Sequence, residues 1–135
     1  MILEQAKEDI QGIIHCAFEV YNELHGGLLE SVYEEAFTIE LHSQGYHVEQ
    51  QKELSVWYKG FKLDKSFRMD IVVNDYIIIE FKAIDEITPE HRKQPFNYMR
   101  LSRMSIGLPL NFSNNGKVIF EKYWFDADSN RCHAS

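Results

Sequence analysis

The sequence contains little cysteine and no long apolar run, and each shortage narrows the range of proteins it could be. Its only cysteines, Cys16 and Cys132, lie too far apart for a disulfide framework or the ligand spacing of a zinc site. No stretch approaches the ~18–20 apolar residues that span a bilayer. The first ten residues carry acids where a signal peptide carries bases. We therefore expect a cytoplasmic protein without a membrane partner.

Basic residues are scarce at the N-terminal end. Residues 1–50 hold ten acids and one base, Lys7, whereas residues 51–105 hold ten bases and eight acids. The whole chain has a net charge of −7. An acidic domain is not an obvious binder of phosphates, so the total charge weakens a nucleic-acid interpretation. The slightly basic middle of the chain keeps that interpretation open.

The chain is long enough for one domain, and its 44% hydrophobic content is enough for a core. Apolar residues at three- and four-residue spacing predict helices, and alternating apolar residues predict strands. The predicted order is helix, helix, three strands, helix, two strands, which is an α/β (α+β) domain with one mixed sheet flanked by helices. The predicted ranges are helices at 3–24, 28–44 and 88–102, and strands at 47–58, 67–73, 76–83, 105–112 and 118–125.

Two features of the sequence should limit the length of the last helix and the extent of the folded domain. Pro95 lies inside the third predicted helix, where it should kink or shorten the helix. The residues after Phe125 are polar, and we expect them to be frayed. We therefore assign residues 1–125 to a single domain and residues 126–135 to a polar C-terminal tail.

Two charged residues interrupt the apolar strand at 76–83. Glu80 and Lys82 are two positions apart, so they project from the same face of the strand. Charges in such a run are costly to bury without partners. Taken alone, the pair is compatible with an exposed sheet face that carries an ion pair, or with a functional site.

Asp70 lies on the preceding strand. It supports a functional site only if its side chain projects from the same face of the sheet as Glu80 and Lys82. A slip of one residue in register would turn its side chain to the other side of the sheet. A simple two-residue turn at Asn74-Asp75 would give the wrong face. The hypothesis therefore predicts an odd-length loop or a bulge between these two strands.

Paired carboxylates on adjacent strands suit a hard cation such as Mg²⁺ or Mn²⁺. Such an ion can lower the pKa of bound water and neutralise charge on a phosphate. A neighbouring lysine can position the water and stabilise the transition state. Asp70, Glu80 and Lys82 together therefore predict the chemistry of phosphodiester hydrolysis.

The spacing of Asp70 and Glu80-Phe81-Lys82 resembles the D…ExK signature of the PD-(D/E)XK nuclease superfamily. Residues 27–33, GLLESVY, resemble the motif that names the bacterial GxxExxY protein family. Residues 88–94 followed by Tyr98 resemble the helix after the ExK strand in that family, and Gly107 and Asn111-Phe112 fall where it has its next strand. The resemblance covers about residues 10–125 and implies a restriction-endonuclease-like core.

The resemblance also implies roles for two further residues. Glu30 would be a third metal ligand or a water-positioning acid, although an acid in the first turn of a helix is also favoured by the helix dipole. Gln94 would contact the metal-bound water or Lys82, and Pro95 leaves its direction open. For Tyr33 we expect packing in the core.

Three functions follow from the sequence. The first is a nuclease that uses Mg²⁺ or Mn²⁺ to cleave DNA or RNA. The alternative is a non-catalytic module of the same fold that binds protein or nucleic acid. The third is a metal-dependent hydrolase of a small phosphorylated compound, which would need a closed pocket where a polymer needs an open groove. A homodimer is compatible with each of them.

Overall fold

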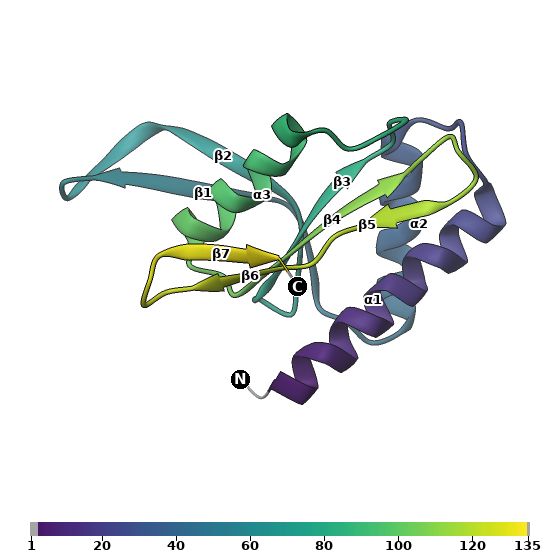
Figure 1. Cartoon of the computed structure of the whole chain (residues 1–135), viewed down its shortest axis with the longest axis horizontal. Coiled ribbons are helices and arrows are strands. Elements are labelled where there is room, and N and C mark those ends of the chain that lie inside the picture. Colours follow the sequence, from purple (N-terminus) through teal and green to yellow (C-terminus); the bar gives the residue numbers. More distant parts are fainter. Residues whose placement is uncertain (1–2, 135) are drawn as a thin grey trace.

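The computed structural model describes residues 3–134, and within them the chain forms a mixed sheet covered by helices on both faces (Figure 1). The strand order is β1-β2-β3-β4-β6-β7, with β5 also paired to β4. The elements are α1 (Leu3–Leu24), α2 (Glu30–Ser43), β1 (Val48–Tyr58), β2 (Phe61–Val73), β3 (Ile77–Lys82), α3 (Pro89–Ser102), β4 (Ile106–Phe112), β5 (Val118–Phe120), β6 (Tyr123–Asp126) and β7 (Arg131–Ala134).

One parallel pair makes the sheet mixed. Strands β3 and β4 run parallel, and α3 provides the crossover that parallel neighbours require. The other strand pairs are antiparallel. The expected α/β architecture with a mixed central sheet is therefore confirmed, and it is a restriction-endonuclease-like fold.

The core lies in two layers, one on each face of the sheet. Helices α1 and α2 pack on one face, where Phe37, Ile79 and Phe112 are fully buried. Helix α3 packs on the other, where Met99 meets Val72 and Ile78. Strands β3 and β4 run between these layers and are buried except at Lys82, so any charged side chain on them must find a partner or reach an opening.

The hairpin of β1 and β2 is longer than the sequence pattern predicted. Strand β2 begins at Phe61 rather than near residue 67. Lys59 and Gly60 connect the strands and both have positive φ, as a two-residue hairpin turn requires. Residues 57–68 are all exposed, so the alternation of buried and exposed positions that marks a strand is missing there.

Two expectations for the C-terminal part are wrong. The single strand expected at 118–125 is divided into β5 and β6, because Pro109 of β4 faces Glu121 in the common register and has no N–H to donate. The expected fraying after Phe125 is wrong for residues 131–134, which form β7 and pair with β6. Their polar composition hid a surface hairpin at the sheet edge.

Helix α3 begins as predicted and is not shortened by Pro95. His91 Nδ1 accepts a hydrogen bond from the Thr88 backbone N–H at 3.1 Å and so caps the helix start. The helix continues to Ser102, with Pro95 buried inside it. None of the helices described for residues 3–134 is both long and apolar enough to cross a membrane.

Candidate functional site

The register of β2 and β3 places Asp70 beside Glu80. Ile71 pairs with Ile79 and Val73 with Ile77, and the next position in this register sets Asp70 opposite Glu80. Three residues, Asn74 to Tyr76, connect the paired segments. The predicted odd-length loop is therefore confirmed, and both carboxylates belong to the same side of the sheet.

Asp70 lies where the sheet divides. Its Oδ2 accepts a hydrogen bond from the Phe81 backbone N–H at 2.9 Å, in place of a strand-to-strand bond. On the other side, Gln51 of β1 adopts φ 49° and falls outside the regular pairing with β2. Among the described residues, β2 and β3 pair only over Ile71–Val73 and Ile77–Ile79, so beyond Asp70 the β1–β2 hairpin is no longer paired with β3.

Glu80 is the most unusual side chain of the site. It is only 2% exposed, and neither carboxylate oxygen has a hydrogen-bond partner. Burial raises the pKa of Glu80 most, the charges of Asp70 and Glu30 also raise it and Lys82 lowers it, and together these effects bring the pKa to about 8. A buried carboxylate without partners is costly, so this position requires either a proton or a cation.

Lys82 ends β3 next to Asn111 of β4, and Asn111 fixes the chain that follows. The fully buried Asn111 side chain accepts a hydrogen bond from the Ile84 N–H and donates one to the Ile84 carbonyl, both at 2.9 Å. Sequence reasoning placed Asn111 only on a strand and missed this contact. The available signal was an amide at the end of an otherwise apolar run.

Glu30 begins α2, and Tyr33 holds the loop that leads to it. Tyr33 Oη accepts a hydrogen bond from the Leu28 N–H at 3.1 Å and donates one to the His25 carbonyl. Its ring is fully buried and stacks on Phe112 at 5.0 Å, so the predicted core packing is confirmed. Loss of hydration raises the pKa of Glu30, Lys82 lowers it and Asp70 raises it, which shows that the three charges interact.

Gln94 reaches the site only through Tyr98. Its Nε2 donates to Tyr98 Oη at 2.7 Å, and the Tyr98 ring packs against Phe67 at 5.6 Å. Burial raises the pKa of Tyr98, and the charges of Glu80 and Asp70 add to this effect. Among the described residues Gln94 has no hydrogen bond to Lys82 or to the carboxylates.

An open polar groove of about 630 Å³ begins at Glu30. It runs between the start of α2 and strand β1, where the side-chain amides of Gln50 and Gln51 lie within hydrogen-bonding distance of Glu34. The residues that line it are Glu30, Ser31, Glu34, Glu35, Gln50 and Gln51. The groove is open to solvent rather than enclosed.

A second group of ligating side chains lies away from this site, near the turn between β2 and β3. His47, Glu49 and Asp75 place ligand atoms within 4.8 Å of one another and could hold a metal ion. The three carboxylates at Glu30, Asp70 and Glu80 are not gathered so closely, as judged over the described residues. Glu49 is also paired with Lys52 at 3.0 Å, and this hydrogen bond lowers the pKa of Glu49.

A mixed sheet that divides beside paired carboxylates, with a lysine two residues after the second, is the arrangement of a nuclease-like α/β fold. The family model for the PD-(D/E)XK nuclease superfamily matches residues 7–123, and the chain therefore belongs to this superfamily. No curated protein and no solved structure matches the chain.

Proposed function

We propose that the chain is a divalent-metal-dependent nuclease that hydrolyses phosphodiester bonds in DNA or RNA. The observation that carries the proposal is the buried Glu80 carboxylate, whose two oxygens have no partner beside Asp70. A cation bound there would satisfy these oxygens and remove the repulsion between the two acids. Membership of the nuclease superfamily supports the same reading.

Asp70, Glu80 and Glu30 would hold Mg²⁺ or Mn²⁺, whose preferred ligands are carboxylate oxygens. The ion, when bound, would lower the pKa of a water molecule and offset negative charge on the phosphate. Lys82 would orient the attacking water and donate a hydrogen bond to the oxygen on which charge develops. Gln94 would act on the site by holding the Tyr98 hydroxyl.

The motif at residues 27–33 supports a finer placement in the GxxExxY family. The tyrosine of the motif anchors the loop before its glutamate through the bonds to His25 and Leu28. This gives a physical reason for the spacing, because Tyr33 lies one helical turn after Glu30. We include this family placement in the proposal.

The open groove favours a polymer over a small phosphorylated compound. The rival that keeps support is a non-catalytic module of the same fold. It is favoured by the acidic groove lining, since Glu34 and Glu35 would repel a phosphate chain. Calorimetric titration with Mg²⁺ separates the two, because the module would bind no ion at millimolar concentration.

The direct test is cleavage of plasmid and single-stranded substrates in Mg²⁺ or Mn²⁺. We expect Asp70→Asn and Lys82→Ala each to lower the rate by ~100-fold or more, the usual loss when a charge-stabilising group is removed. Lys7→Gln, an exposed base on α1, is the control for an unspecific loss of charge. Cleavage that continues unchanged in both site variants would refute the assignment.

A further inference from the structure

The outer part of the β1–β2 hairpin, residues 52–68, forms an arm whose end extends beyond α3 (Figure 1). Its base packs on α3 through Leu54 and Phe67. Its end is rich in exposed rings: Phe61 is 74% exposed, Trp57 62% and Tyr58 60%. Large apolar groups gathered in water usually mark a surface that binds something. Asp70 lies on β2 two residues after the arm, so a ligand that runs along the arm from its exposed end would reach the candidate site.

The arm is basic in an acidic chain. Residues 52–68 contain five bases and two acids, while the whole chain has a net charge of −7. Among the described residues, Lys59, Lys62, Lys65 and Arg68 form no ion pair. Their charges are therefore free to attract an anionic partner.

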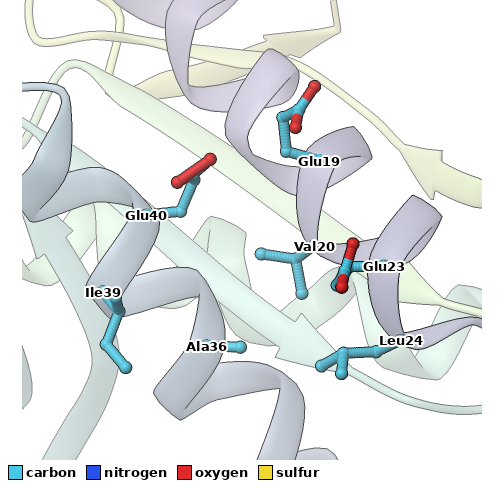
Figure 2. A pocket seen from close by; sticks show the side chains of 7 residues that line it. All are labelled: Glu19, Val20, Glu23, Leu24, Ala36, Ile39 and Glu40. Carbon is cyan, nitrogen blue, oxygen red and sulfur yellow. The ribbon is translucent and has the colours of Figure 1, made fainter.

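The opposite sign prevails in the groove between α1 and α2. There Glu19 and Glu23 of α1 and Glu40 of α2 surround a floor that includes Val20 and Ala36 (Figure 2). A polyanion is repelled by this surface and attracted by the arm, so the charge distribution directs it to one side of the molecule.

An aromatic and a basic side chain lie together on one face of the arm. Trp57 lies opposite Lys62 in the antiparallel register, and Glu53 lies opposite Arg68. Partners across a hairpin share a face, as do alternate residues along a strand. Trp57 and Lys62 therefore share a face at the end of the arm, and Arg68 lies nearer its base, beyond a shift in register between Ser55 and Trp57. From Lys62 along β2 to Asp70 the strand rise of ~3.3 Å per residue gives a distance of roughly 26 Å.

We propose that the arm binds single-stranded DNA or RNA, with an unpaired base stacked on Trp57 and phosphates bound by Lys62 and Arg68. The inference rests on the proposed nuclease function, since the arm would lead the strand to Asp70. Proteins bind single strands by stacking nucleobases on exposed aromatic rings and by binding phosphates with basic side chains nearby. In a duplex the faces of the nucleobases are covered by their neighbours and cannot stack on a protein ring. An acidic peptide would satisfy the charges but would leave the rings without stacking partners.

A second copy of the chain is the main rival occupant, because its α1–α2 groove is acidic and apolar. Such a contact would join two different surfaces, and head-to-tail contacts give rings or filaments rather than a closed pair. A bound single strand explains three observations together: the exposed aromatic rings, the basic side chains that form no ion pair among the described residues, and the position of Asp70 on the same strand as the arm. Sedimentation of the arm variants nevertheless distinguishes the two occupants.

The test measures fluorescence anisotropy of labelled 12-nucleotide DNA and RNA with the full chain in EDTA, which prevents metal-dependent cleavage. We expect Trp57→Ala to weaken single-strand binding at least fivefold and to affect a blunt duplex of the same sequence less. Lys62→Gln should lower the slope of log affinity against log salt by about 0.7, the value for one phosphate on a single strand. Lys7→Gln and Ile39→Ala are the controls for an exposed charge and an exposed apolar group.

Equal binding of wild type and both arm variants would overturn the inference, as would loss of binding in the two controls to the same degree. A wild-type oligomer that dissociates when Trp57 is replaced would assign the arm to a second copy instead. If the arm variants lose binding but the wild type cleaves nothing in Mn²⁺, the arm inference stands and the nuclease proposal fails. If the wild type cleaves in a way that needs Asp70 and Lys82, but the arm variants bind single strands normally, the nuclease proposal stands and the arm inference fails.

Discussion

At the scale of single residues, the site depends on a glutamate that the fold buries without a partner. Glu80 was found from its sequence position because a charge stands out in an apolar strand. Its isolation was not predictable, since that depends on how closely β4 and α3 cover it. A site that leaves a charge unsatisfied is destabilising for the fold and useful for binding a cation.

The raised pKa of Glu80 makes folding stability depend on pH. Its pKa is about 8 in the folded chain, above the ordinary 4.5, so the unfolded chain loses this proton first. Unfolding therefore becomes easier as pH rises from about 4.5 to about 8, by at most ~1.4 kcal/mol per pH unit. Urea unfolding in EDTA across this range measures the slope.

Glu80→Gln should flatten the slope, because glutamine mimics the protonated acid and does not titrate. Glu23→Gln, which alters an exposed acid on α1, should keep the slope of the wild type. An unchanged slope in Glu80→Gln would mean that other groups control the pH dependence.

At the scale of elements, the sequence predicted helices and strands well where one face is buried. It predicted α1 over its full range and the odd loop between β2 and β3. It failed for the outer part of β2, where both faces meet solvent, and for β7, whose residues are polar. Periodicity reports burial, so strands that bury nothing leave no pattern.

The loop before α2 shows how an element positions a site residue. Tyr33→Phe would keep the ring on Phe112 and remove the bonds to His25 and Leu28. We expect a loss of ~1 kcal/mol in urea unfolding, the usual net contribution of a hydrogen bond whose exposed loop partners can bond to water instead. Tyr33→Ala should cost ~3–5 kcal/mol because it also removes the ring.

If Glu30 assists the metal, Tyr33→Phe should also weaken Mn²⁺ binding in calorimetry, because the loop no longer holds the start of α2. Thr38→Val, which removes a hydroxyl bonded within the same helix, is a control away from the loop. Normal Mn²⁺ affinity in Tyr33→Phe would limit the tyrosine to a structural role.

At the scale of the whole molecule, metal binding, protonation and folding are linked. An ion at Glu80 must displace its proton, so affinity should rise as pH increases toward 8. We expect Mn²⁺ to raise the melting temperature more at about pH 8 than at about pH 6. Thermal unfolding with and without the ion checks this.

Two variants identify which group of ligands is responsible. Glu80→Gln should abolish the increase in melting temperature, while His47→Ala, which disrupts the exposed group with Glu49 and Asp75, should retain it. The opposite pattern would place the stabilising ion at the turn between β2 and β3. The superfamily could be inferred from sequence alone, whereas the group formed by His47, Glu49 and Asp75 was visible only in the fold.

The measurement that tests the central claim most directly is anomalous diffraction from a crystal of the chain soaked in Mn²⁺. The account predicts a peak within coordination distance of Asp70 and Glu80, close to the end of β3. A peak found only beside His47, Glu49 and Asp75, or none near Asp70, would contradict it.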